Sequence, residues 1–215
     1  MMKRRTLCTA CGFLAAFLVW TAAVCFVDVR AIGPQGSEVG LAGLNQWVHQ
    51  LTGVHMTLYT ITDWLGLVPI AFALAFALLG LFQWIGRKSI RKVDRSILVL
   101  GGFYLAVIGA FLLFEEVVVN CRPVLIGGIL ETSYPSSTTL LVLCVMSTAV
   151  MQLRALIKKP VVRRWVSAGI HAFTVFMVVG RLISGVHWFS DIVGGILLSA
   201  GLVLLYDAVS RLDQT

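Results

Sequence analysis

Six long apolar runs, separated by polar segments, constrain the fold of this chain more than any other feature. The runs cover residues 7–27, 65–85, 97–119, 136–153, 165–183 and 191–209. Each is close to the roughly 20 residues that an α-helix needs to cross a bilayer. Helices satisfy their own backbone hydrogen bonds in lipid. The sequence therefore predicts an all-α, polytopic membrane protein with six transmembrane helices, built as one domain over residues 1–215.

The composition excludes an ordinary soluble domain. Hydrophobic residues make up 59% of the chain and charged residues only 13%, whereas charged residues of soluble domains approach about 25%. The first run follows a basic start, as in a signal peptide. It is longer than a typical signal core, and residues 22–25 form a poor cleavage site, so we expect a retained first span.

The basic residues lie almost entirely on one side of the predicted bundle. Fourteen of the 17 Lys and Arg fall in the amino terminus, in the loops 86–96 and 154–164, and at Arg211. Six spans bring all of these segments to the same side, which the positive-inside rule assigns to the cytoplasm. We therefore expect a multi-pass plasma-membrane protein with both termini in the cytoplasm. This placement also argues against a nucleic-acid partner, although the net charge is +7.

The first outer segment, residues 28–63, is expected to contain a short helix in the membrane interface. Its apolar residues recur at helical spacing: Leu41, Leu44, Trp47, Val48 and Leu51. The Trp47 ring would anchor this helix at the level of the lipid headgroups.

Two outer loops carry residues suited to phosphate chemistry. The only arginines outside the basic segments are Arg30, Arg122 and Arg181, and a guanidinium matches the oxygens of a phosphate bidentately. His187 follows Arg181 after five residues, and Asp191 follows His187 after three. A histidine can act as the nucleophile, and a carboxylate beside it can hold its tautomer. We expect Arg122 and Arg181 to bind phosphate, and His187 and Asp191 to be catalytic.

A predicted helix start adds an anion site to the same loops. Pro135 is followed by Ser136, Ser137 and Thr138, and proline followed by hydroxyl residues indicates the start of a helix. The free N–H groups of such a start attract anions. Ser136 and Ser137 are therefore further candidates for phosphate binding.

These residues resemble the signature of the type 2 phosphatidate phosphatase superfamily, which includes bacterial lipid phosphatases and vanadium haloperoxidases. Its three motifs are Lys, six residues, Arg-Pro; then Pro-Ser-Gly-His; then Ser-Arg, five residues, His, three residues, Asp. Arg122-Pro123 matches the first in part, Pro135-Ser136 matches the second in part, and Arg181, His187 and Asp191 match the third at the family's spacing. The resemblance covers about residues 97–209. It implies a membrane phosphatase with a phosphohistidine intermediate and a site on the outer face.

Three positions depart from the family signature. Glu115 stands where the family has Lys, Thr138 where it has the second-motif His, and Gly180 where it has Ser. The resemblance assigns that His as the general acid for the leaving group, and a threonine cannot take this role at neutral pH. Glu115 and Thr138 are therefore modulators of the expected site. Three states of Glu115 stay open: paired with Arg122, protonated, or pointing away.

The missing acid bears on the substrate. Hydrolysis of a lipid monoester expels an alkoxide, which needs a proton, whereas hydrolysis of a diphosphate expels a lipid phosphate whose second pKa is about 6. The leading interpretation is a metal-independent membrane lipid phosphatase that prefers an isoprenoid diphosphate, such as undecaprenyl diphosphate. The alternatives are a lipid phosphotransferase and a non-catalytic lipid-phosphate binding or transport protein.

No cofactor or metal is expected from the sequence. The five cysteines include a CxxC at Cys8 and Cys11, but this pair lies inside an apolar run without further ligands. A metal site would need a polar cluster around it. The expected partners are the lipid substrate and the surrounding membrane lipids, and the sequence leaves the oligomeric state open.

Overall fold

The computed structural model describes residues 2–210, and within this range it contains α-helices and short 3-10 helices but no β-strand. The elements are α1 (Met2–Phe26), η1 (Pro34–Gly36), α2 (Ala42–Thr52), α3 (Met56–Leu65), α4 (Leu67–Arg87), η2 (Ile90–Lys92), α5 (Arg95–Glu116), α6 (Ser137–Leu156), α7 (Pro160–Ile183) and α8 (Phe189–Ser210). Six helical segments of this range are long and apolar enough to cross a membrane. The predicted all-α, six-span fold class is confirmed.

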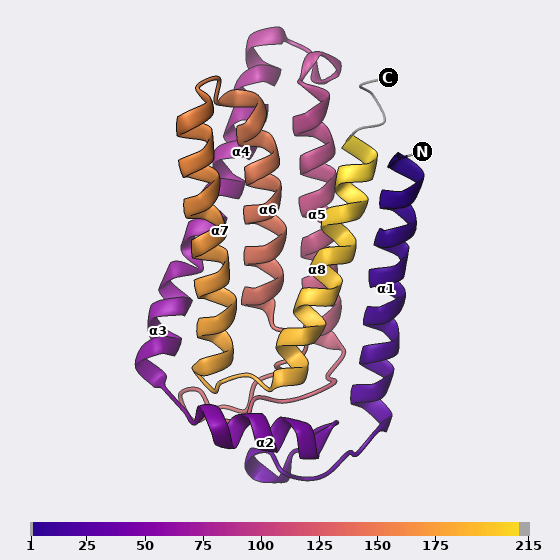
Figure 1. Cartoon of the computed structure of the whole chain (residues 1–215), viewed down its shortest axis with the longest axis vertical. Coiled ribbons are helices and arrows are strands. Elements are labelled where there is room, and N and C mark those ends of the chain that lie inside the picture. The colour runs from indigo at the N-terminus through magenta and orange to yellow at the C-terminus, as the bar shows by residue number, and fades with distance from the viewer. Residues whose placement is uncertain (1, 211–215) are drawn as a thin grey trace.

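The long helices form one bundle around α6. Figure 1 shows them running along the same axis, with α2 lying across one end. Helix α6 packs against α4, α5, α7 and α8, and α1 packs along α8. The most apolar window of α6 is 56% buried within the protein, a larger share than in any other span of residues 2–210. Helices α6 and α8 are therefore the spans best shielded from lipid.

The second span is longer than the sequence predicted. We expected it at residues 65–85, with residues 28–63 as a polar outer segment. Instead Met56–Leu65 is helix α3, which Gly66 joins to α4 as one candidate span, Met56–Arg87. The prediction was wrong because it took Asp63 as the end of a polar loop, whereas the Asp63 carboxylate pairs with a guanidinium of α7.

The predicted short helix of the first outer segment exists as α2, with the polar side chain of Asn45 turned inward. Asn45 is fully buried, whereas the side chains of Trp47 and Leu51 stay 60% and 68% exposed. Most of the apolar stripe that indicated this helix therefore stays exposed, although Leu41 packs against the core of the bundle. Asn45 instead contacts Ser190, in the site described below.

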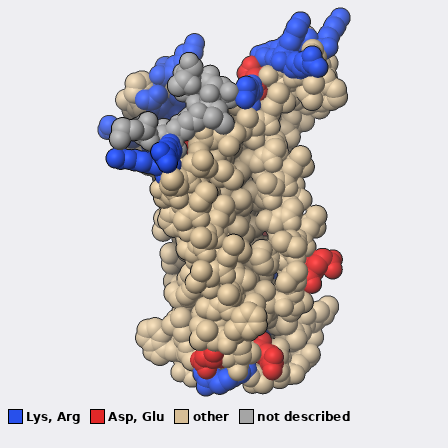
Figure 2. Space-filling model, turned by 90° about the vertical axis from the view of Figure 1, so that its right-hand side faces the viewer, with Lys and Arg blue, Asp and Glu red and all other residues tan. Residues whose placement is uncertain are grey.

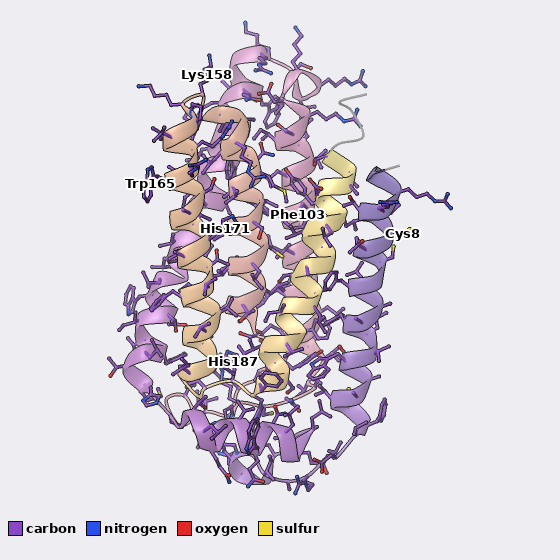
Figure 3. All side chains as sticks on the ribbon, viewed as in Figure 1. Cys8, Phe103, Lys158, Trp165, His171 and His187 are labelled. Atoms are coloured by element: carbon purple, nitrogen blue, oxygen red, sulfur yellow. The ribbon has the colours of Figure 1, made fainter. Side chains whose placement is uncertain are left out.

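The two ends of the bundle differ in charge. The start of α1 and the end of α8 lie at the same end as the loops between α4 and α5 and between α6 and α7 (Figure 1), and Lys and Arg gather there (Figure 2). His187 lies at the other end, near α2, far from Lys158 and Cys8 (Figure 3). Arg211, which the sequence adds to the basic end, lies outside the described residues. The chain is thus a multi-pass membrane protein with His187 at the end opposite its basic loops.

A close contact between two loops closes the end that carries His187. Gly185 has φ +68°, and a Cβ at this position would lie 1.9 Å from the carbonyl oxygen of Gly53. The N–H of His55 donates to the carbonyl of Ser184 over 2.9 Å. Only glycine fits here, so the loop 184–188 is held against the segment that joins α2 to α3.

Candidate active site

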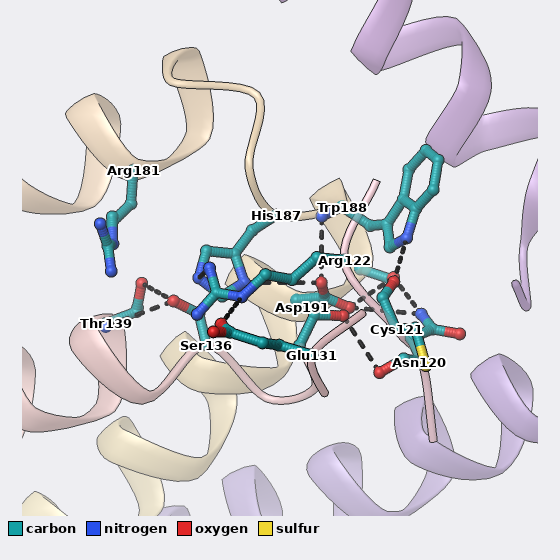
Figure 4. Close-up of polar contacts among 12 residues, drawn as sticks. Asn120, Cys121, Arg122, Glu131, Ser136, Thr139, Arg181, His187, Trp188 and Asp191 are labelled. Atoms are coloured by element: carbon teal, nitrogen blue, oxygen red, sulfur yellow. Dashed lines mark hydrogen bonds and ion pairs between the residues drawn. The ribbon is translucent and has the colours of Figure 1, made fainter. Parts of the chain in front are cut away.

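The structure brings two of the predicted residues into direct contact. Nη1 of Arg122 lies 3.3 Å from Nε2 of His187, and both residues are buried (Figure 4). A guanidinium can only donate hydrogen bonds. Nε2 of His187 must therefore accept this bond, which leaves the proton of the neutral ring on Nδ1.

Asp191 lies on the other side of the same ring. Its Oδ2 is 3.7 Å from Nδ1 of His187, longer than a hydrogen bond, and it accepts the backbone N–H of Trp188 at 3.0 Å. The carboxylate is fully buried. Catalytic hydrogen bonds are often long in the free enzyme and shorten once substrate is bound. The His187 ring thus has the Arg122 cation at Nε2 and the Asp191 carboxylate on the side of Nδ1.

Burial keeps the His187 ring neutral. Burial lowers the pKa of His187 most, the Arg122 and Arg181 cations also lower it, and the Asp191 carboxylate raises it, which together give a pKa of about 4. A neutral imidazole retains the lone pair on Nε2 that a nucleophile needs. The ring is therefore ready to attack an electrophile at neutral pH.

Arg181 is held beside this group by helix α3. Its buried guanidinium donates from Nη2 to Oγ1 of Thr138 at 2.8 Å and to Oδ1 of Asp63 at 3.2 Å. It also lies 4.8 Å from the centre of the Tyr59 ring. Its Nε atom is buried without a hydrogen-bond partner among the described residues. Asp63 offsets much of the cost of burying this cation, and the unpaired Nε leaves donor capacity for an anion.

The start of α6 contributes differently from the prediction. The Ser136 hydroxyl is fully buried and caps the helix, accepting from the N–H of Thr139 at 3.5 Å and from its hydroxyl at 3.1 Å. The Ser136 N–H donates to the carbonyl of Asp191. Ser136 therefore orients the helix start, whereas the side chain that reaches the cavity at this point is Ser137.

A cavity of about 470 Å³ opens beside His187 and Arg122. Ser137, Glu115 and Glu131 also line it. Of the three states considered for Glu115, pairing with Arg122 is excluded: its Oε2 accepts from the Thr132 hydroxyl at 3.4 Å, and the side chain is exposed. Glu131 pairs with Arg122 instead, with Oε2 2.9 Å from Nε. A bound anion would have to compete with this carboxylate.

A second cavity lies beside the first. It has a volume of about 370 Å³ and is lined almost entirely by apolar side chains of α4, α5 and α6. Both cavities are lined by Phe111, Ser137 and Leu140. The polar end of the second cavity carries Thr138 and Asp63. A molecule with an anionic head and an apolar tail fits the two cavities together.

Sequence reasoning did not find the partners that hold these groups. Asp63 pairs with Arg181, Glu131 pairs with Arg122, and Asn120 donates to Asp191. A buried arginine requires an anion nearby, but ten acidic residues were candidates for two arginines. Only the fold selects among them.

Comparison with known proteins gives a likeness in fold and a match to a family model over part of the chain. The structure resembles the crystal structure of a transmembrane PAP2-type phosphatidylglycerolphosphate phosphatase from Bacillus subtilis, with a TM-score of 0.59, 18% identity, and coverage of 94% of this chain and 96% of that chain. This likeness concerns the fold. Residues 111–212 match the model of the PAP2 superfamily. Over these residues, the chain resembles the members of the PAP2 superfamily. No curated protein matches it.

The PAP2 match includes every residue that the sequence assigned to the site, from Glu115 to Asp191. It does not include α1 to α4, which supply Asp63 and the cover formed by α2. The first half of the chain therefore supplies the part of the site that lies outside the PAP2 match.

Proposed function

We propose that the protein is a membrane lipid phosphatase that forms a phosphohistidine at His187. The observation that carries this proposal is the buried contact between Arg122 and Nε2 of His187 at the wall of a cavity, with Asp191 behind the ring. Arg122 and Arg181 would bind the phosphate oxygens, together with the N–H groups at the start of α6. In this scheme, the positive charge that binds the phosphate comes from Arg122 and Arg181.

The reaction proceeds in two steps. Nε2 of His187 attacks phosphorus, the bond from phosphorus to the leaving oxygen breaks, and the leaving group departs with that electron pair. Asp191 then accepts the Nδ1 proton as a hydrogen bond and stabilises the positive ring. Water next attacks the phosphohistidine, releasing inorganic phosphate and restoring the neutral ring. An alcohol in place of water would make the protein a phosphotransferase.

The substrate class follows from the second cavity and from Thr138. An apolar cavity beside the phosphate site favours a lipid tail, and Thr138 lines this cavity, where we place the leaving group. Because a threonine supplies no proton at neutral pH, a lipid phosphate is a better leaving group here than an alkoxide. We therefore propose an isoprenoid diphosphate, such as undecaprenyl diphosphate, as the preferred substrate.

Phosphate release from a panel of lipid monophosphates and diphosphates by the purified protein tests this function. We expect release from isoprenoid diphosphates to be fastest, and acid-quenched protein to carry phosphate on His187. Lipid binding without either release or a trapped phosphohistidine would favour the binding-protein alternative. Transfer of phosphate to an added lipid alcohol, in preference to water, would favour the phosphotransferase.

The site is proposed to face the extracytoplasmic side. The basic loops at the opposite end of the bundle support this orientation. In intact cells, a membrane-impermeant thiol reagent is expected to label Cys121, which lies beside the site, and not a Ser89→Cys variant at the basic end. The other cysteines should first be replaced by alanine. Labelling of the Ser89→Cys variant but never of Cys121 would reverse the orientation.

A further inference from the structure

The Asp191 carboxylate is surrounded by neutral donors on the side away from His187. Its Oδ1 accepts from Nδ2 of Asn120 and from the hydroxyl of Ser190, each at 3.3 Å. Its Oδ2 accepts from the backbone N–H of Trp188. Asn120, Ser190 and Asp191 are each at most 1% exposed. Water cannot replace any of these donors, so the protein alone decides how the carboxylate is turned.

The amide of Asn120 can be oriented in only one way. Its Oδ1 accepts the backbone N–H of Gly40 at 3.1 Å, and an N–H is a donor only. The NH₂ group must therefore face the other side, where Ser190 lies at 3.2 Å and Asp191 at 3.3 Å. A contact with the first outer segment thus aims a donor at the carboxylate.

Asn45 of α2 orients the Ser190 hydroxyl in the same way. Its Oδ1 accepts the Ser190 N–H at 3.0 Å, and its Nδ2 donates to the Ser190 Oγ at 2.9 Å and to the Gly40 carbonyl at 2.8 Å. The Ser190 oxygen receives N–H groups from both asparagines. Its own proton is left for Asp191. Two asparagines, from two outer segments, therefore set both donors on Oδ1.

Gly40 allows these two asparagines to meet. A Cβ at this position would lie 1.5 Å from the carbonyl oxygen of Val24, at the end of α1. The backbone of residue 40 consequently passes close enough to α1 to donate to Asn120 and to accept from Asn45. This part of the network lies outside the region that matches the PAP2 superfamily.

We propose that Asn120 is a positioning residue for the phosphoryl-transfer step, and that Asn45 supports it. The amide of Asn120 holds Asp191 with Oδ2 turned toward Nδ1 of His187, ready to accept its proton when the ring becomes positive. This inference rests on the proposed function, because it assigns His187 the role of nucleophile. It adds that the first half of the chain builds part of the catalytic centre.

Two variants of Asn120 separate positioning from simple support of the loop. Asn120→Ala removes the donor, and loss of a hydrogen bond to a buried charge is expected to lower kcat about 10- to 100-fold while KM changes less than about threefold. Asn45→Ala is also expected to lower kcat. Gln46→Ala changes the neighbouring, exposed residue of α2 and is the matched control, with both constants unchanged.

Asn120→Asp provides a pH-dependent test with nearly the same shape. Its carboxylate still accepts from Gly40 but faces Asp191 without a proton, so kcat is expected to be low at neutral pH. As the pH falls, like charges this close take up one proton between them, and the new O–H donates to Asp191. The other titratable groups around Asp191 are His187, Arg122, Cys121 and Tyr134, and the variant leaves them unchanged. Activity of this variant relative to wild type should therefore rise about tenfold or more between pH 7.5 and about pH 5.5.

Binding of vanadate and of inorganic phosphate gives a measurement that needs no turnover. Vanadate accepts a fifth ligand, so its affinity depends on a positioned nucleophile, whereas phosphate affinity depends on the arginines. Asn120→Ala is expected to weaken vanadate binding about tenfold and to leave phosphate binding within about twofold. Calorimetry on the purified full-length protein measures both.

The outcomes distinguish this inference from the proposed function. A wild type that releases no phosphate from any lipid, but binds vanadate in an Asn120-dependent way, contradicts the function and supports the positioning role. An active wild type whose Asn120→Asp variant follows the wild-type pH profile overturns the positioning role alone. A parallel loss of vanadate and phosphate affinity in Asn120→Ala also overturns it. A wild type that neither turns over lipid nor binds vanadate overturns both.

Discussion

Replacement of His187 by alanine is expected to lower lipid-phosphate turnover by about 10⁴-fold or more, because alanine has no atom that can attack phosphorus. Phosphate binding should remain, since Arg122 loses only the ring to which it donates. The comparison uses initial rates of phosphate release together with lipid binding to the same preparations. His55→Ala is the matched control: this exposed ring bonds to the Thr52 carbonyl outside the site, and its loss should leave the rate unchanged.

Asp191→Asn is expected to lower turnover by about 10²- to 10⁴-fold, as when the carboxylate behind a catalytic histidine is replaced by an amide. Binding of lipid should change little, because Asp191 does not line the cavity. Near-normal phosphatase activity of His187→Ala would refute the nucleophile assignment. Normal activity of Asp191→Asn with an inactive His187→Ala would instead show that the ring needs no carboxylate.

The helices could be predicted from hydropathy alone because lipid leaves the backbone no other solution. The ends of these helices were harder to predict where a polar residue has a partner elsewhere in the fold. Asp63 resembles the end of a loop until Arg181 of α7 is brought beside it. The same holds for Asn45, whose polar side chain suggests a solvated face of α2 but is fully buried against Ser190.

The candidate site, too, could be predicted where its residues are close in sequence and not where distant segments meet. The spacing of Arg181, His187 and Asp191 suffices to predict their proximity, because they lie within one loop and the two helix ends that flank it. Arg122 comes from a different loop, and only the fold brings it to His187 and to its ion-pair partner Glu131. The role of Ser136 changed for a local reason: a serine at the N-cap uses its hydroxyl on the helix it begins.

Thr138→His is expected to raise hydrolysis of lipid monoesters much more than hydrolysis of lipid diphosphates. General acid catalysis contributes about 10²- to 10⁴-fold when the leaving group needs a proton. A lipid phosphate, with its second pKa of about 6, leaves without one at neutral pH. In the structure, Thr138 lines the apolar cavity and accepts from Arg181, so an imidazole at this position would meet the leaving oxygen at the junction of the two cavities.

The test measures the rates with phosphatidate and with undecaprenyl diphosphate for wild type and for Thr138→His. The ratio of the phosphatidate rate to the diphosphate rate should be higher in the variant than in wild type. Thr132→His is the matched control, because Thr132 lines the first cavity away from α6 and its replacement should affect both substrates alike. Asp63 is the acidic residue that shares the second cavity with Thr138. If Asp63 already supplied the proton, wild type would prefer phosphatidate and Asp63→Asn would abolish that preference. That result, or an equal effect of Thr138→His on both substrates, would refute the argument from leaving-group acidity.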